Sequence, residues 1–381
     1  MSTPSTPSTP STEPDLLYSE EEEALRAALR DLLGDHCDAA GVITRVESDA
    51  PHDRALWKSL ADGMGLAGLL VPEARGGQGA THREAAVVLE ELGRFVAPVP
   101  YLTSAVVATE ALLACAGARG TEGAGDAAEL LARLASGRTV GALAVGLHTA
   151  PGGAFATART ADGRLHGELT GVADAAAADV LLVPADDGGL YAVDADADAV
   201  SVTGQLSLDL TRPVATVALA GAAGRRLGNA GLAARRALRA GAGLLASEQL
   251  GLADWTLTET VRYLKERKQF NRPVGGFQAL KHRLAQLWLE VVNLRAAARN
   301  AADALARDED ADLASALAQA YAAPVAVRAA EEALQLHGGL GMTWEHPVHL
   351  YLKRAKADSI AFGTAGAHRE ALAELADLRA P

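Results

Sequence analysis

The segment YLKERKQFNRPVGGFQALKHRLAQL, residues 263–287, carries the strongest local signal in the chain. It predicts the end of one helix with a dense basic cluster, then a Pro/Gly turn, and then a second helix that begins near Phe277-Gln278. Arg267 and Lys268 stand near the helix end, where a cation can hold a phosphate group or complement the helix dipole. Without further context the segment favours the dipole interpretation and leaves the phosphate interpretation open.

Helical periodicity surrounds this segment from about residue 228 nearly to the end of the chain. Four long helices and a terminal one are predicted near 230–267, 277–306, 312–337, 347–361 and 365–378. Their Ala- and Leu-rich faces suit a close-packed antiparallel bundle. Residues 228–381 are therefore predicted to form a C-terminal helical bundle.

Three regions precede the bundle, and they differ in pattern. Residues 1–14, MSTPSTPSTPSTEP, have no apolar side chain after Met1 and are predicted to be a disordered Ser/Thr/Pro tail rather than a signal peptide. Residues 15–125 show helical periodicity and are predicted to form an all-α domain. Residues 126–227 contain short apolar or alternating runs between Asp-Gly and Gly-Gly turns, which indicates a small antiparallel β-domain. The predicted fold class is α+β.

The composition excludes several classes of protein. A hydrophobic content of 49% with 22% charged residues is typical of a globular chain, and no run of eighteen uncharged apolar residues predicts a membrane span. The formal net charge of −13 argues against nucleic-acid binding, because phosphate neutralisation needs a basic face. A few arginines in a cleft still suffice for a small anionic ligand.

Cysteine and histidine usage indicates no disulfide framework and no metal site. Cys37 and Cys115 lack any pairing or ligand spacing, which is typical of thiols in a reducing, cytoplasmic setting. His346 and His349 could share a helix face at i, i+3, but no third ligand stands near them in the sequence. We therefore expect no metal ion.

A second motif, EALQLHGGLGMTWEHP at residues 332–347, follows a predicted helix. Gly338, Gly339 and Gly341 leave bare backbone that a cofactor or another chain can approach. The same glycines also suit an ordinary helix C-cap followed by a turn.

Taken together and in this order, the motifs resemble the acyl-CoA dehydrogenase family of flavoproteins. VPEARGGQG, EELGR, ERKQFNRPVGGFQALKHRLAQL and QLHGGLGM stand at family spacing, and the resemblance covers about residues 15–380. It implies an N-terminal helical domain, a middle β-barrel or sandwich and a C-terminal four-helix bundle. It also implies a cytoplasmic enzyme that binds FAD between two subunits.

The resemblance implies a reaction and a set of cofactor-binding residues. The family oxidises an acyl thioester across Cα–Cβ: a carboxylate removes the α-proton, and the β-hydrogen leaves as hydride to flavin N5. Thr364 keeps a flavin-contacting position. The pyrophosphate and adenosine side of a neighbour's FAD would meet Arg267, Gln269, Phe270, Gln335, Gly338 and Gly339.

The half of the flavin site that a subunit builds for itself departs from the family pattern. The family has a Thr-Glu-Pro-Gly-like loop continuing to Gly-Ser-Asp, and then a Trp-Ile-Thr stretch that faces the isoalloxazine. This chain has HTAPGGAFATA at 148–158, where Ala150 replaces the glutamate, and LTGVADAAAADVLLV where the tryptophan is expected. The family's stacking partner for the flavin is therefore missing.

The family's catalytic glutamate is also missing. It directly precedes Gly-Thr in the family, and in SIAFGTAG (359–366) that position is Phe362, which cannot accept a proton. Some members carry the glutamate on the first bundle helix, where counting back without gaps from Arg267 reaches Gly241. The base, if this chain has one, lies elsewhere.

Three sources of a base remain open. Glu248 lies two turns beyond Gly241 on the same helix face, in the apolar stretch GLLASEQLGLA, and is either a base with a raised pKa or a buried structural acid. Asp358 could reach the same pocket only if the helix before Phe362 continues. A partner subunit could also supply the carboxylate.

The motifs that would contact a neighbouring subunit's FAD are intact, whereas those that would hold the chain's own FAD are lost. This is the pattern expected for one half of a heteromeric α₂β₂ enzyme. We expect α,β-desaturation of an acyl thioester, on CoA or on a carrier protein, with FAD shared across the interface. The partners expected are the thioester and a second subunit, identical or paralogous, and neither a nucleic acid nor a membrane. Two alternatives remain: a repurposed enzyme for a non-oxidative step in a biosynthetic pathway, and a non-catalytic scaffold.

Overall fold

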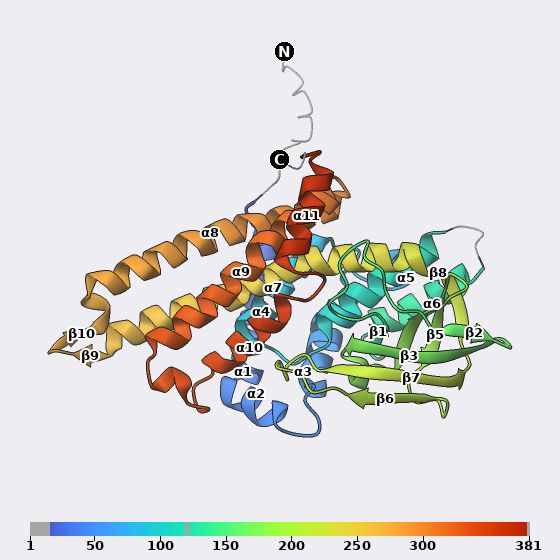
Figure 1. The fold of residues 1–381 in the computed structure, drawn as a ribbon, viewed down its shortest axis with the longest axis horizontal. Coiled ribbons are helices and arrows are strands. Elements are labelled where there is room, and N and C mark those ends of the chain that lie inside the picture. Colours follow the sequence, from blue (N-terminus) through green and yellow to red (C-terminus); the bar gives the residue numbers. More distant parts are fainter. Residues whose placement is uncertain (1–15, 119–121, 379–381) are drawn as a thin grey trace, which may run out of the picture.

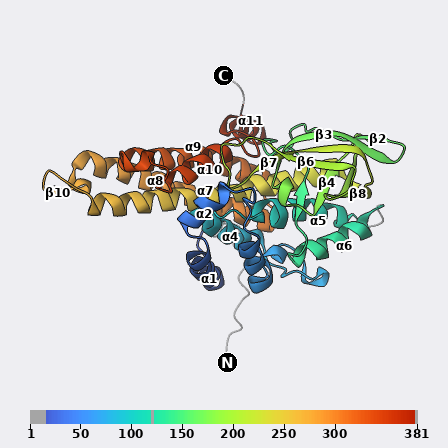
Figure 2. The same cartoon turned by 90° about the horizontal axis from the view of Figure 1, so that it is seen from below.

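The computed structural model describes residues 16–118 and 122–378, so the tail predicted for residues 1–14 lies outside the described residues. Within these ranges the chain forms a helical N-terminal part, a β-domain and a long helical bundle that extends away from the β-domain (Figures 1 and 2). This is the three-part α+β arrangement that the sequence predicts.

Two helices of the N-terminal part have strongly specified starts. Ser19 and Glu22 form a capping box at the start of α1, and Thr81 and Glu84 form another at the start of α4. The elements are α1 (Glu20–His36), α2 (Ala39–Val46), α3 (Arg54–Lys58), α4 (His82–Phe95), a π-helical segment (Tyr101–Ala108), α5 (Thr109–Gly117) and α6 (Ala124–Ala135). The predicted domain boundary at 125/126 falls inside α6, because buried leucines at 130, 131 and 134 keep the helical period up to Ala135.

The β-domain is a sandwich of two four-stranded sheets, with strand orders β1-β4-β5-β8 and β2-β3-β7-β6. Its strands are β1 (Gly141–Leu143), β2 (Arg159–Ala161), β3 (Arg164–Ala173), β4 (Val180–Pro184), β5 (Gly189–Asp194), β6 (Val200–Gly204), β7 (Val214–Ala222) and β8 (Arg225–Asn229). Leu169 of β3 and Leu181 of β4 belong to the one core that both sheets enclose.

One strand pair departs from the antiparallel expectation. β1 and β4 pair in parallel, with Gly141 opposite Val180. The chain leaves the first sheet after β1, forms β2 and β3 in the second sheet, and then returns to β4 in the same direction, which is the crossover that a parallel pair requires.

The C-terminal bundle matches the predicted helices closely. Its elements are α7 (Ala230–Glu266), β9 (Lys268–Gln269), β10 (Arg272–Pro273), α8 (Gln278–Arg307), α9 (Ala311–Leu336), α10 (Val348–Asp358) and α11 (Ala365–Leu375). Helix α7, with 37 residues, is about 55 Å long and runs from the β-domain to the far tip of the bundle (Figure 1).

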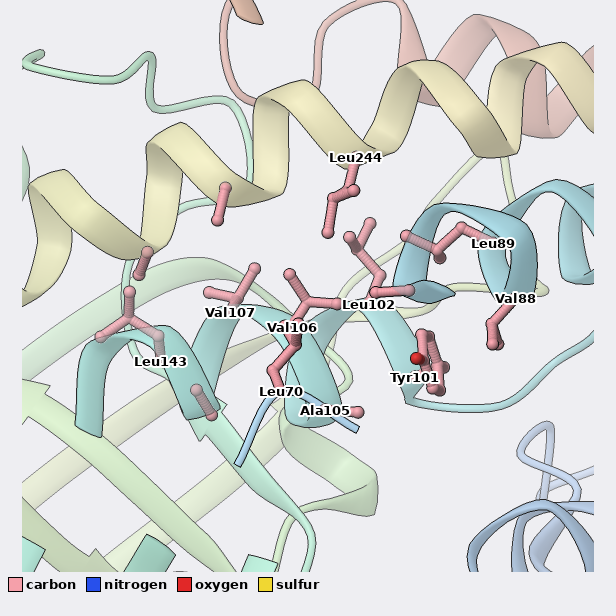
Figure 3. Close-up of a cluster of buried hydrophobic side chains, with 14 of the residues drawn as sticks. Leu70, Val88, Leu89, Tyr101, Leu102, Ala105, Val106, Val107, Leu143 and Leu244 are labelled. Atoms are coloured by element: carbon pink, nitrogen blue, oxygen red, sulfur yellow. The ribbon is translucent and has the colours of Figure 1, made fainter. Parts of the chain in front are cut away.

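The middle of α7 is clamped by the N-terminal part. A Cβ at Gly251 would lie 1.9 Å from the Glu90 carbonyl oxygen, and one at Gly93 would lie 2.2 Å from the carbonyl oxygen of Glu248. Helices α4 and α7 therefore cross backbone to backbone, and only glycine fits at the crossing. Figure 3 shows Leu244 of α7 pointing from the same stretch toward the π-helical segment that carries Val107.

Candidate cofactor and active site

The ends of α7 and α9 lie side by side and form an open groove of about 730 Å³. Arg267 follows the last residue of α7 as its C-cap, and Gln269 lies on β9 of the short hairpin that comes next. Gln335 is in the last turn of α9, and Gly338 and Gly339 follow that helix. Five of the six residues that the resemblance assigns to a neighbour's cofactor thus line one surface.

The groove offers groups that suit a dinucleotide phosphate. Arg267 is exposed, and within residues 16–118 and 122–378 no carboxylate lies at ion-pair distance from it, whereas Arg283 on the same surface is paired with Glu332 at 2.6 Å. Nothing stands within 4 Å of where a Cβ would project from Gly338 or Gly339. A guanidinium without an ion-pair partner, next to accessible backbone, fits the pyrophosphate half of an FAD site.

Phe270 lies outside the groove lining. It forms the tip of the β9–β10 hairpin with Asn271, and both residues have positive φ, 51° and 59°, as a tight type I′ turn requires. Its side chain is 85% exposed and meets Phe277 edge-on, with 6.0 Å between ring centroids. Within one chain Phe270 therefore points away from the bundle rather than toward the other groove residues.

Thr364 lies at the opposite end of α9. It is the N-cap of α11, and its hydroxyl oxygen accepts a hydrogen bond from the Ala367 amide at 3.2 Å. The hollow next to it, about 480 Å³, is lined by loop 150–153, by α11 and by the start of α9 near Ser315. Twenty residues of α9 separate Ser315 from Gln335, so the groove lies about 30 Å away.

Phe362 is buried and occupies strained backbone. Its φ is +52°, its side chain belongs to the main hydrophobic core, and its amide donates to the Leu147 carbonyl at 2.6 Å. The ring lies against Gly241, where a Cβ would stand 2.8 Å from the nearest ring carbon. The two positions at which the resemblance places a glutamate are therefore neighbours in space, and a phenyl ring fills the room between them.

Glu248 is ion-paired on both sides. Arg354 donates to one carboxylate oxygen at 2.6 Å, and Arg212 donates to the other. Burial raises the pKa of this carboxyl, but the two guanidinium charges and their hydrogen bonds outweigh burial and hold the pKa below its ordinary value. This direction is opposite to the raised pKa that a base here would need, and the two ion pairs favour the interpretation of Glu248 as a buried structural acid.

Asp358 belongs to the same buried network. Arg212 donates to its Oδ1 at 2.9 Å, and Arg354 pairs with Asp209 at 2.6 Å. Burial, followed by the charge of Glu248, raises the pKa of Asp358 well above its usual range. Two guanidiniums thus face three buried carboxyl groups, those of Asp209, Glu248 and Asp358. A raised pKa means that this last carboxyl, that of Asp358, holds its proton more tightly than an exposed aspartate does.

Comparisons with known proteins agree with this fold. The N-terminal domain model of acyl-CoA dehydrogenases matches residues 19–138, and the C-terminal domain model matches residues 205–376. The acyl-CoA dehydrogenase IpdE2 of Mycolicibacterium smegmatis is 33% identical over 345 residues, which cover 91% of this chain and 95% of the relative. The chain belongs to the acyl-CoA dehydrogenase family.

Two solved structures of this family have closely similar folds. The ChsE4–ChsE5 complex of Mycobacterium tuberculosis contains a chain with a TM-score of 0.84 and 31% identity, covering 96% of this chain and 100% of that one. A variant of the Tcur3481–Tcur3483 steroid ACAD gives a TM-score of 0.80 and 33% identity, covering 94% and 98%. Acyl-CoA dehydrogenases are oxidoreductases whose fold binds FAD.

A cavity of about 180 Å³ lies beside the network of this acyl-CoA dehydrogenase homologue. Arg212 and Asp358 line it, and the Oδ2 atom of Asp358 is buried there without a hydrogen-bond partner. His148 and Leu147 of the β-domain close its other side.

Sequence reasoning missed part of this site. Arg212 and Asp209 lie in the irregular segment between β6 and β7, in LSLDLTRPV, where no helical or strand period draws attention to them. The sequence did offer one signal, because both are charged residues in an apolar stretch. In the structure both are buried, as Arg354 is. Among the described helices of this family member, none is long and apolar enough to cross a bilayer.

Proposed function

We propose that this chain is one half of a heteromeric acyl-CoA dehydrogenase. It contributes the pyrophosphate and adenosine contacts to an FAD held mainly by a paralogous partner, and the partner contributes the catalytic carboxylate. The reaction is the α,β-desaturation of an acyl thioester. The observation that carries this proposal is the contact between Phe362 and Gly241, which closes both glutamate positions in a chain whose cofactor groove is open.

The groove residues would bind and orient the cofactor rather than react. Arg267 would pair with the pyrophosphate, the side-chain amides of Gln269 and Gln335 would hydrogen-bond polar groups of the nucleotide, and Gly339 would let the backbone approach it. When bound, FAD supplies the acceptor for the hydride that leaves Cβ. The distance of about 30 Å along α9 between this groove and the surroundings of Thr364 supports a division of the two halves between neighbouring subunits.

Proton abstraction is the step that this chain is poorly built to perform. The α-carbon of a thioester is a weak acid, so its proton needs a carboxylate placed within reach. Phe362 and Gly241 offer none, Glu248 is ion-paired with two arginines, and burial beside Glu248 raises the pKa of Asp358. A base from a partner subunit accounts for all four observations.

The similar proteins support both the assembly and the substrate class. Two of the matched structures carry names of paired proteins, ChsE4–ChsE5 and Tcur3481–Tcur3483, and the second is named a steroid ACAD. By this likeness the partner here is a paralogue, and the acyl group is a bulky one of the steroid type, carried on CoA or on a carrier protein.

The decisive measurement is the flavin-to-subunit ratio of the purified chain, alone and co-expressed with the paralogue encoded next to it. We expect colourless, inactive protein alone, and a yellow complex that desaturates acyl thioesters with half as many flavins as subunits. Stoichiometric flavin and turnover in the chain alone would contradict the proposal.

Two other outcomes select the alternatives. Release of a non-oxidised product by colourless protein would assign the repurposed enzyme. A complex whose flavin content and turnover do not change when Arg267 is removed would leave this chain as a scaffold.

A further inference from the structure

Three potential metal ligands from distant parts of the chain meet near the tip of the bundle. Glu259 belongs to α7, His337 directly follows α9, and His346 precedes α10. One ligand atom from each residue lies within 4.8 Å of those from the other two. This is not the pair of histidines that the sequence singles out, because His349 instead stacks on Trp344 at 4.4 Å between ring centroids.

One ring nitrogen of the buried His337 has no hydrogen-bond partner, and leaving it so destabilises the fold. Its side chain is 2% exposed, and Nδ1 lies 2.7 Å from the Ala333 carbonyl oxygen, so Nδ1 carries the proton and Nε2 carries the lone pair. Nε2 has no hydrogen-bond partner. A buried acceptor without a partner destabilises the fold, and a metal ion would give it one. A ring fixed by an Nδ1–H···O=C bond is the usual setting of a metal-binding histidine.

His346 stands next to this nitrogen. Its ring centroid is 4.4 Å from that of His337, with the two planes tilted by 47°. The Val348 amide donates to His346 Nδ1 at 3.3 Å, at the long end of the range for such bonds. Binding of a metal through Nε2 would move the ring proton and give up only this weak contact.

Glu259 can take part without losing its charge partner. Its two carboxylate oxygens accept from Arg262 at 2.5 and 2.9 Å, and each oxygen keeps a further lone pair. Arg262 also donates to Glu266 at 2.9 Å and is half-exposed, so it has a second carboxylate to hold it when Glu259 binds an ion.

We propose that Glu259, His337 and His346 form a binding site for a divalent transition-metal ion of the zinc class, with a fourth position open to water. Two nitrogens and one carboxylate oxygen are a known donor set for zinc. Ligand atoms around a tetrahedral zinc lie about 3.3 Å apart, so the site closes by up to about 1.5 Å on binding. The turn between His337 and His346, which contains Gly338, Gly339 and Gly341, can supply that movement.

The ion would join three segments beside the cofactor groove. His337 itself lines that groove, and Gly338 and Gly339 follow it directly. Metal binding would hold the ends of α7 and α9 together and fix the turn that carries the bare backbone. The site is independent of which subunit supplies the base.

The test uses the untagged full chain, stripped with a chelator and titrated with Zn²⁺ by calorimetry, with Co²⁺ absorption as the report on ligand geometry. We expect one ion per chain. His346→Ala and Glu259→Gln should each weaken binding at least about tenfold. His349→Ala is the matched control, because it removes a neighbouring histidine outside the cluster, and it should bind as the parent does.

Stability provides a second readout that a misfolded variant cannot imitate. The metal-free variants are first compared with the parent by circular dichroism and by Tm. Zn²⁺ should then raise the Tm of the parent and of His349→Ala, since a ligand that binds only the folded state stabilises it. At the same Zn²⁺ concentration it should raise the Tm of His346→Ala much less. Absence of binding by the parent, or equal binding by folded His346→Ala and Glu259→Gln, would overturn the proposal.

Discussion

Two regions of the helical bundle present opposite situations to a ligand. At the C-terminal ends of α7 and α9, Arg267 is unpaired among the described residues and the backbone of Gly338 and Gly339 is accessible, so polar groups are available for binding. At the second region the positions suited to chemistry are filled, by the Phe362 ring and by carboxyls that are buried in ion pairs with Arg212 and Arg354. Under the proposed function, this contrast would mean that the binding and the proton-transfer halves of one active site are divided between two subunits.

The largest effect is expected at the buried ion pairs around Glu248, and it concerns the stability of the fold. Glu248→Gln leaves Arg212 and Arg354 without their shared buried charge, and we expect the free energy of unfolding to fall by about 3–5 kcal/mol. Urea unfolding of the chain measures it. A catalytic base would behave in the opposite way: the variant would fold normally, and only turnover in the complex would disappear.

The second largest effect is expected in the groove at the ends of α7 and α9, and it concerns FAD binding. Arg267→Ala removes one charge-assisted contact to a phosphate, which is worth about 1.5–3 kcal/mol, so we expect roughly 10- to 100-fold weaker FAD binding by the co-expressed complex. Flavin fluorescence titration measures it. Lys265→Ala, a charge loss in the same final turn of α7 and outside the groove lining, is the control. Equal losses in the two variants would favour the helix-dipole interpretation of Arg267.

The contact between Gly241 and Phe362 can be tested by placing a larger side chain at Gly241. Gly241→Ala would place a methyl group 2.8 Å from the Phe362 ring and 3.1 Å from Val107, and overpacking of this kind costs about 1–3 kcal/mol. Phe362→Leu should relieve part of that cost, so a double-mutant cycle should give a coupling of at least about 0.5 kcal/mol. Additive effects would show that the two positions do not touch in solution.

The smallest effect concerns Asp358 and depends on pH. Because its folded pKa is raised, its contribution to stability is fully present below the unfolded pKa, near 3.8, and is lost as the pH rises toward the folded pKa. Asp358→Asn mimics the protonated carboxyl, so it should be nearly neutral at pH 4. Unfolding curves between pH 4 and 8 should show that the free energy of unfolding of Asp358→Asn increases relative to that of the parent as the pH rises. A constant difference would mean that Asp358 is ionised in the fold.

The sequence predicts the bundle and the groove well because their signals are local. The periodicity gives each bundle helix to within three residues of its observed ends. The groove follows from two motifs, one at the C-terminal end of α7 and one at the C-terminal end of α9. These ends meet because α8 runs back between the two helices in the sequence, so that α7 and α9 point the same way.

What the sequence does not predict depends on partners far apart in the chain. The short runs of the β-domain predict strands but not their pairing, and the parallel pairing of β1 with β4 follows from a crossover between the two sheets. The environment of Glu248 required Arg212, which lies 36 residues away in a segment without periodicity. The neighbourhood of His346 likewise comes from Glu259 and His337, which a spacing rule for nearby histidines does not find.

The glycine crossing of α4 and α7 has a consequence for how this protein unfolds. With Gly93 and Gly251 pressed against the backbone of the opposite helix, α4 cannot leave without exposing the most buried stretch of α7 to water. The N-terminal helices and the bundle therefore share one cooperative transition, even though the β-domain lies between them in the sequence. We therefore expect the amide hydrogens of α4 and of the middle of α7 to exchange together, and a bundle expressed without residues 20–95 to expose the face of α7 that α4 covers.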